Sequence, residues 1–217
     1  MNVLWAENPH SQNGKFAFSD APAEAKAENS CSQMLPKFLQ EDTETKITNA
    51  QKGTLIHLCM QKLDTQNKNY TYTQIKDLVQ DLENKKIITH KEAETININK
   101  VYQFTKSKIW EEMIHAHVVY REKAFYINIP AKEVYNKDIE EKILVQGVID
   151  LYYINEQNEL ILVDFKTDYV EDRNEQILVD KYKVQLELYK RALEDALQRK
   201  VDKVYIYSTY LEKEILL

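Results

Sequence analysis

Two strand-like apolar runs joined by a polar turn constrain the fold of this chain more than any other feature, because each run carries a carboxylate. Both runs lie within residues 145–168. Asp150 interrupts the first run, Asp164 interrupts the second, and Lys166 follows Asp164 at strand spacing. Burying such charges is costly unless they are paired with each other or with a metal. The pattern therefore predicts a hairpin that holds a cluster of charged side chains.

Antiparallel pairing about the turn in this segment predicts which side chains meet. Leu151 then lies opposite Val163, and Asp150 lies opposite Asp164, with the Cβ atoms of each pair about 5 Å apart. Because side chains alternate between the two faces of a strand, Lys166 shares the face of Asp164. A slip of one residue would place the two acids on opposite faces. In the predicted register, Asp150, Asp164 and Lys166 converge on one patch.

Two carboxylates on one patch favour a metal site. They repel each other, and one pKa should rise unless a cation lies between them. An all-oxygen site suits Mg²⁺ or Mn²⁺, and the sequence has no Cys/His cluster nearby that would indicate zinc. The alternative is a buried Asp–Lys ion pair with a second Asp at a strand end, although such a pair needs only one acid. We therefore expect the parts of a metal-dependent phosphodiesterase site.

Composition limits the class of protein. The 217 residues, 29% charged and 43% hydrophobic, with three glycines and four prolines, are ordinary for one soluble domain with elaborations. Cys31 and Cys59 are too few for a disulfide framework or a four-cysteine metal or iron–sulfur site. No run approaches about 20 apolar residues, and no signal peptide pattern opens the chain, so we expect a cytoplasmic protein with reduced thiols.

The net charge of −6 bears on nucleic-acid binding. Free-standing nucleic-acid binders are typically basic, with clustered Lys and Arg. The acidity counts against tight autonomous binding to DNA. It does not count against a cutting module to which another part of a larger protein delivers the strand.

The pattern of the chain divides it into three regions. Residues 1–47 are irregular and predict a flexible linker or docking segment. Residues 48–117 predict helices. The first begins at a capping box at Thr48, the second is capped by Thr73 and ends near residue 83, and two more cover 90–97 and 101–116.

Residues 118–217 predict a mixed sheet with one long helix. The expected strands are 118–129, the hairpin 143–154 and 159–167, and a last strand at 201–211, with the helix at 176–199 before it. This order predicts an α/β fold in which one right-handed helical crossover precedes the final strand.

Four further positions gain meaning beside the hairpin. His57 lies in the first amphipathic helix, where a lone histidine is more often a satisfied core group than a ligand. Glu122 interrupts the first strand, and its simplest interpretation is a solvated charge or a neighbour of Arg121. Gln185 and Tyr189 share one face of the long helix, where a surface Gln above a packed Tyr is the plainer interpretation.

The motifs together, in this order, resemble a known family. They are Gly-Thr-x-x-His at 53–57, Arg-Glu-x-x-Phe at 121–125, Gly-x-x-Asp at 147–150, Asp-Phe-Lys-Thr-Asp at 164–168 and Gln-x-x-x-Tyr at 185–189. The set resembles the RecB-like branch of the PD-(D/E)XK nucleases over about residues 46–211. Within that branch it is most similar to the C-terminal nuclease domain of the larger, A-type component of AddAB-type helicase–nucleases, notably at 53–61, 145–150 and 160–170.

The resemblance implies a fold and a set of roles. The fold would be restriction-endonuclease-like, a mixed sheet flanked by helices with an N-terminal helical elaboration, making 48–217 the nuclease domain (48–117 helical, 118–217 the catalytic sheet and helix). The metal ligands would be His57, Asp150, Asp164 and the backbone carbonyl of Phe165. Lys166 would activate the attacking water and stabilise charge on the phosphate. Gln185 and Tyr189 would position the strand or the lysine, and Glu122 aligns with an acid near the site whose role stays open.

The resemblance also implies a reaction and partners. It implies a deoxyribonuclease, the exonuclease domain of an ATP-dependent helicase–nuclease, that uses Mg²⁺ with Mn²⁺ as a substitute and acts in double-strand break repair by homologous recombination in the bacterial cytoplasm. The substrate would be single-stranded DNA ends delivered by a helicase motor, alongside an AddB-like second subunit. No Gly-x-x-x-x-Gly-Lys-Thr loop occurs here, so we expect an excised domain without its motor. The alternatives are a stand-alone exonuclease and a non-catalytic docking domain.

Overall fold

The structure is a computed structural model that describes residues 46–132 and 141–217. Its centre is a five-stranded sheet in the order β1-β2-β3-β4-β5. The strands are β1 (Val118–Pro130), β2 (Lys142–Ile154), β3 (Leu160–Lys166), β4 (Lys203–Ser208) and β5 (Lys213–Leu216). β3 and β4 run parallel, and the other neighbours run antiparallel. This mixed sheet confirms the predicted restriction-endonuclease-like class.

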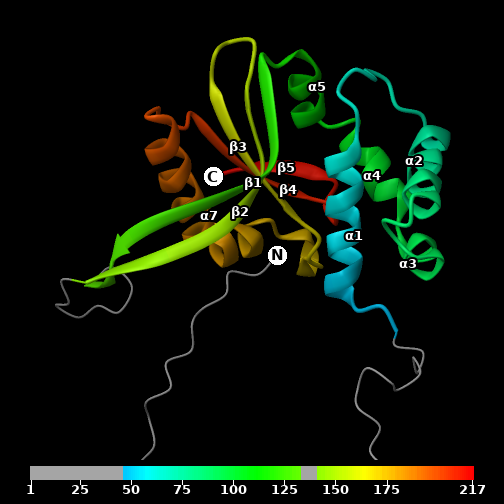
Figure 1. The fold of residues 1–217 in the computed structure, drawn as a ribbon, viewed down its shortest axis with the longest axis horizontal. Helices are drawn as coiled ribbons and strands as arrows, with labels where there is room; N and C mark the ends of the chain where they lie inside the picture. Colours follow the sequence, from blue (N-terminus) through cyan, green and yellow to red (C-terminus); the bar gives the residue numbers. More distant parts are fainter. Residues whose placement is uncertain (1–45, 133–140) are drawn as a thin grey trace, which may run out of the picture. The chain divides into compact units, whose positions relative to one another are not determined.

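Helices cover both faces of the sheet. α1 (Asn49–Lys62), α2 (Tyr72–Asn84), α3 (His90–Thr95), α4 (Ile98–Phe104) and α5 (Lys108–His115) precede it, and α7 (Gln176–Leu197) connects β3 to β4 after the short 3-10 turn η2 (Glu171–Arg173). In Figure 1, α7 lies on one side of the sheet and α1 to α4 lie on the other. Among the described residues, no helix is both long and apolar enough to cross a membrane.

The central strand β3 is buried on both faces, which explains its nearly continuous apolar sequence. Ile161, Val163 and Phe165 pack into the core shared with the N-terminal helices. Leu160 and Leu162 pack into the core shared with α7. Asp164 and Lys166, in phase with this second set, therefore point toward α7.

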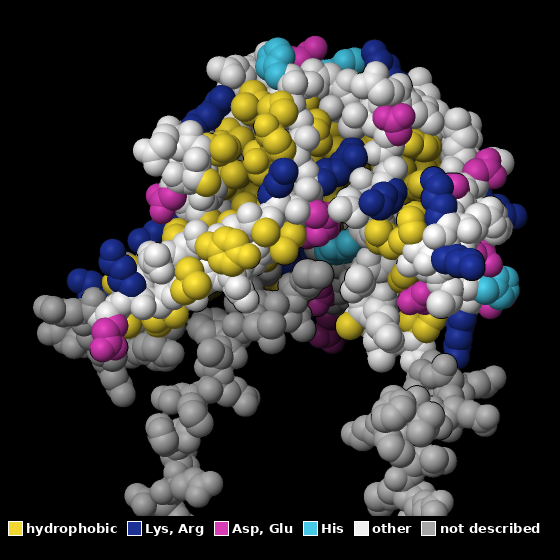
Figure 2. Space-filling view, in the orientation of Figure 1, with side chains coloured by type: hydrophobic (Ala, Val, Ile, Leu, Met, Phe, Trp, Pro, Cys, Tyr) yellow, Lys and Arg dark blue, Asp and Glu magenta, His cyan; other side chains and the backbone are white. Residues whose placement is uncertain are grey.

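β1 and β2 pair along their whole length, from Val118 with Ile154 to Pro130 with Lys142. Because β2 pairs with β3 only over its last four residues, most of the β1–β2 ribbon extends beyond the sheet. Figure 1 shows this ribbon leading away from the other strands, and Figure 2 shows hydrophobic side chains along it. Tyr126, which is 69% exposed, is one of them.

The first helix begins as predicted, and the second begins two residues earlier. Thr48 caps α1 with a capping box, because its side chain accepts from the Gln51 amide while Gln51 binds back. Thr71, and not Thr73, caps α2 in the same way, with Gln74 as its partner. The expected cap residue was wrong because Thr71 has the glutamine three positions ahead that a capping box requires.

Two other expectations were wrong. The helix expected over 101–116 is two helices, α4 and α5, because the Thr105 and Ser107 hydroxyls donate to carbonyls of the preceding turn and Ser107 then caps α5. The last strand expected over 201–211 ends at Ser208. A turn in which the Leu211 amide donates to the Ser208 hydroxyl then leads into β5, which the sequence pattern did not predict.

The described cysteine is a buried thiol. Cys59 is free, fully buried in α1, and burial raises its pKa to about 12. This fits the expected reduced thiol. Cys31 and the segment 1–45, for which a flexible linker or docking role was expected, lie outside the described residues.

Candidate active site

Three acidic residues form a row across β1, β2 and β3. Arg121 pairs with Leu151 and Lys123 pairs with Ile149, so Glu122 lies opposite Asp150. The row continues onto β3 at Asp164, which follows directly after the last paired residue of the β2–β3 ladder. Opposed residues of an antiparallel pair share one face of the sheet. The three carboxylates therefore meet on the face toward which Asp164 points.

The predicted hairpin register is confirmed. Leu151 pairs with Val163, which leaves Asp150 and Asp164 at the next position on the two strands. Here the backbone ladder ends, and the Asp150 side chain replaces it by accepting a hydrogen bond from the Phe165 amide at 2.8 Å. This bond fixes the Asp150 carboxylate beside the end of β3.

The backbone at Glu122 is irregular. Its φ of 50° lies in the left-handed region, which is uncommon for a residue inside a strand. Such conformations cost on the order of 1–3 kcal/mol and re-aim side chains next to functional sites. Burial raises the pKa of Glu122, the charge of Asp150 adds to this shift, and His57 opposes it.

α1 brings a histidine to the acids. His57 Nδ1 lies 3.7 Å from Asp150 Oδ2. One donor atom each from His57, Glu122 and Asp150 all lie within 4.8 Å of one another. Donors bound to one divalent cation at about 2.0–2.3 Å are separated by no more than about 4.6 Å, so small movements let all three bind a single ion. Figure 2 shows acidic and histidine side chains next to one another near the centre of this face.

This geometric group differs from the ligand set expected from the sequence. Glu122 joins His57 and Asp150, whereas Asp164 Oδ2 forms an ion pair with Lys166 Nζ at 2.6 Å. The simplest interpretation of Glu122, a solvated charge beside Arg121, was wrong. Arg121 instead donates to the carbonyls of Gln61 and Leu63 near the end of α1.

The two hairpin acids have pKa values shifted in opposite directions. Burial, reinforced by the charge of Asp150, raises the pKa of Asp164 to about 6, against the opposing effect of Lys166. Burial also acts to raise the pKa of Asp150, but the hydrogen bond and charge of His57, the Phe165 amide and the charge of Lys166 hold it below its usual value. Divergent pKa values of neighbouring acids are typical of functional sites.

Lys166 is held by α7. Its ammonium donates to Gln185 Oε1 at 3.1 Å, and Gln185 Nε2 donates to the Tyr189 hydroxyl at 2.7 Å. The two α7 residues expected to act together thus contact each other and the lysine. Tyr189 is buried, and burial raises its pKa to about 12.

Comparison with known proteins identifies the family. A family model of the PD-(D/E)XK nuclease superfamily matches residues 26–214. The chain belongs to this superfamily. It is 41% identical over 177 residues to the A-type component of an ATP-dependent helicase/nuclease from Clostridium kluyveri, a match that covers 79% of this chain and 14% of the relative.

Two other relatives bear the same name. The protein of Thermoanaerobacter sp. (strain X514) is 38% identical over 177 residues, 79% of this chain and 14% of its own length. That of Clostridium perfringens (strain SM101 / Type A) is 35% identical over 190 residues, 83% of this chain and 15% of its own length. The chain thus spans about a seventh of the length of the relatives it matches. PD-(D/E)XK nucleases use divalent metals, and the His57, Glu122 and Asp150 donors fit one.

Sequence reasoning missed a tyrosine beside the lysine of this PD-(D/E)XK domain. The Tyr182 ring lies under Lys166 Nζ at 4.0 Å, and its hydroxyl donates to Asp168 Oδ2 at 2.8 Å. Asp168, expected to be solvated, also pairs with Lys181. The spacing of 182, 185 and 189, three and four apart on α7, could have indicated one helix face.

Two glycines of the PD-(D/E)XK domain allow close packing around the site. A Cβ on Gly53 would lie 2.6 Å from Thr167 Oγ1, so only glycine lets α1 approach the end of β3 this closely. A Cβ on Gly147 would lie 2.7 Å from the Phe125 ring and 3.4 Å from the Tyr189 ring. Both contacts set the distance between the sheet and a helix that carries a site residue.

Proposed function

We propose that this chain is a metal-dependent deoxyribonuclease domain that hydrolyses phosphodiester bonds, with Mg²⁺ as the working ion and Mn²⁺ as a substitute. The observation that carries the proposal is the row Glu122, Asp150 and Asp164 ending beside Lys166. Membership in a nuclease superfamily supports it.

The residues divide into two groups by contact. His57, Glu122 and Asp150 would hold a divalent cation, with Asp164 and the Phe165 carbonyl as further expected ligands. When bound, such a cation polarises the phosphate and lowers the pKa of a bound water.

Lys166, paired with Asp164 and bound to Gln185, holds a positive charge at the edge of this group. There it would orient the attacking water and stabilise the charge that grows on the phosphoryl oxygens. A preorganised positive donor of this kind is worth about 2.7–4 kcal/mol, the scale of one oxyanion-hole donor. Gln185 and Tyr189 would keep the ammonium in place.

The relatives suggest the larger context. Because they are named as components of ATP-dependent helicase/nucleases, we propose that this domain cuts single-stranded DNA ends that a helicase motor delivers, beside an AddB-like second subunit. The process would be double-strand break repair by homologous recombination in the bacterial cytoplasm. The net charge of −6 supports delivery by a motor over autonomous capture of DNA.

The test is cleavage of labelled single- and double-stranded DNA by the full chain with Mg²⁺, Mn²⁺ or EDTA. We expect metal-dependent cutting that Lys166→Ala and the isosteric Asp150→Asn reduce by about 100-fold or more. Lys85→Ala, which removes an exposed lysine paired with Asp81 on α2, is the matched control and should cut normally.

Thermal unfolding shows whether each variant is folded. A folded wild type that binds DNA without cutting it at any enzyme concentration, with either metal, would contradict the proposal and favour a docking domain. Equal cutting by wild type and Lys166→Ala would remove the lysine from the mechanism.

A further inference from the structure

We propose that Tyr169, braced by Tyr210, is a stacking platform for a nucleobase of single-stranded DNA next to the cutting site. The inference rests on the proposed function, since it places a base of the same strand whose phosphate is cut. It assigns a binding role to side chains outside the metal and lysine groups.

The two rings lie where the site residues of β3 end. Tyr169 follows Lys166 by three residues, which span at most about 11 Å even when fully extended. Tyr210 follows Thr209, whose amide donates to the Lys166 carbonyl at 2.9 Å. Both tyrosines thus leave the carboxyl ends of the parallel strands β3 and β4, the edge at which α/β sheets bind ligands. A nucleotide beside the cut phosphate is within their reach.

Tyr169 is exposed but not loose. Its side chain is 72% exposed, the largest fraction among the exposed large hydrophobic side chains of the described residues, whereas the next residue, Val170, is fully buried. The Tyr169 ring contacts the Tyr210 ring edge to face, with centroids 4.8 Å apart and planes at 65°. A ring fixed by its neighbour loses little conformational entropy when a base stacks on it.

A positive charge stands behind the pair. The Arg173 guanidinium lies 6.0 Å from the centroid of the Tyr210 ring and donates to the Leu211 carbonyl at 3.2 Å. Asp172 and Arg173 both have left-handed backbones, with φ values of 50° and 55°, a strained arrangement that directs this turn. Aromatic rings beside a guanidinium are the combination that proteins use to bind single strands.

Charge alone would not hold a strand here, because Glu171 and Asp172 lie in the same turn as Arg173 and the whole chain is acidic. Stacking supplies affinity that does not depend on phosphate neutralisation and tolerates any base. A duplex offers no free base face, so the platform would favour single strands.

The first experiment measures equilibrium binding of a fluorescein-labelled single-stranded oligothymidylate to the full chain in EDTA, by anisotropy. We expect Tyr169→Ala to weaken binding about 5- to 150-fold, the range for one stacked base. Tyr169→Phe, which keeps the ring, should bind like wild type. Tyr126→Ala removes an equally exposed tyrosine from the β1–β2 ribbon and is the matched control.

The second experiment replaces the bases of the oligonucleotide by abasic sites, one position at a time, again in EDTA. Wild type should lose affinity at one position, and Tyr169→Ala should be insensitive there. Equal binding by wild type and Tyr169→Ala, the same abasic profile for both, or no binding of single strands by wild type would overturn the platform.

These outcomes are separate from those of the cleavage test. Tyr169-dependent binding without metal-dependent cutting would sustain the platform and contradict the nuclease, and cutting without Tyr169-dependent binding would do the reverse.

Discussion

The Lys166 ammonium lies between a carboxylate and an aromatic face, and the ring predicts a measurable effect on rate. Tyr182→Leu removes a cation–π contact worth about 0.5–2 kcal/mol, so we expect kcat to fall roughly 2- to 30-fold with KM little changed. Tyr182→Phe keeps the ring and loses only the hydrogen bond to Asp168, and it should recover most of the rate.

Single-turnover cleavage with excess enzyme measures the effect on the chemical step. If Leu and Phe variants lost rate equally, the hydroxyl and Asp168 would matter and the ring would not. A rise in KM alone would mean that Tyr182 contacts DNA and does not position the lysine.

Single residues mark the limit of what the sequence could predict. Asp150, Asp164 and Lys166 were foreseeable, because charges inside apolar strands stand out and strand alternation fixes their faces. The place of Glu122 in the group was not, since it depends on a left-handed backbone in mid-strand that no composition signals. Tyr182 was hidden because a tyrosine on an amphipathic helix is ordinary until the lysine is placed above it.

At the scale of elements, the contact between α1 and β3 predicts the effect of one methyl group. Gly→Ala inside a helix normally stabilises by about 0.5–1 kcal/mol. At Gly53 the added Cβ would meet Thr167 Oγ1 at 2.6 Å, so we expect Gly53→Ala to destabilise by about 1–3 kcal/mol, as overpacking does. Because His57 lies one turn further along α1, cleavage should also fall.

Thr167→Ala supplies the matched control, since it removes the atom that the new methyl group meets. In urea unfolding, the double variant should be more stable than Gly53→Ala alone. Additive effects of the two substitutions would show that α1 does not depend on this contact.

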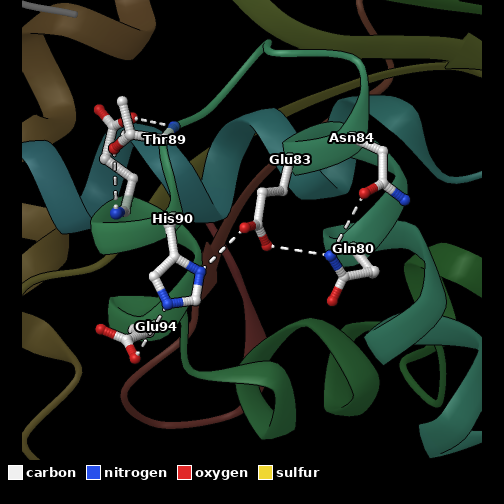
Figure 3. Close-up of polar contacts among 7 residues, drawn as sticks. Gln80, Glu83, Asn84, Thr89, His90 and Glu94 are labelled. Carbon is white, nitrogen blue, oxygen red and sulfur yellow. Dashed lines mark hydrogen bonds and ion pairs between the residues drawn. The ribbon is translucent and has the colours of Figure 1, made fainter.

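A second element-level prediction concerns the joint between α2 and α3, shown in Figure 3. His90 Nδ1 lies 2.8 Å from Glu83 Oε1, and Nε2 lies 3.4 Å from Glu94 Oε1. Gln80 donates to the other Glu83 oxygen at 3.1 Å. The hydrogen bond and charge of Glu83, then the charge of Glu94, raise the pKa of His90 above its ordinary value of 6.5.

A raised folded-state pKa means that the protonated imidazole stabilises the fold. This contribution is complete below the ordinary pKa and is lost as the pH rises through the raised value. Wild type should therefore exceed His90→Gln in urea resistance near pH 6 and match it near pH 8.5, with the difference reduced by salt because the group is exposed. A difference of the same size at both pH values would rule out the charged imidazole as its source.

Elements were predicted where one signal dominated and missed where two competed. The β2–β3 register followed from its apolar pattern. The division of α4 from α5 depends on hydroxyls that bind the backbone within an otherwise helical pattern. β5 is four residues long, too short for alternation to distinguish it from a turn.

For the whole molecule, a cation held by the acidic row should stabilise the fold. An ion that binds only the native state at about 100 times its Kd adds roughly 2.7 kcal/mol, which raises the Tm of a domain of this size by several degrees. We expect Mg²⁺ or Mn²⁺ to raise the Tm of wild type and EDTA to reverse the shift.

Asp150→Asn should lose this response, and Asp81→Asn, which changes an exposed acid on α2, should keep it. Differential scanning calorimetry at matched ionic strength makes the comparison. The same metal-dependent shift in Asp150→Asn would move the cation away from the acidic row.

The acidic row also has a consequence for folding. Its members and their lysine come from α1, β1, β2, β3 and α7, so contacts among the site residues join parts of the chain far apart in sequence. Local helices form in microseconds, whereas contacts between distant strands are slow to form. During refolding, the helical circular dichroism signal should therefore return first, and the ability to cut should be among the last native properties to appear.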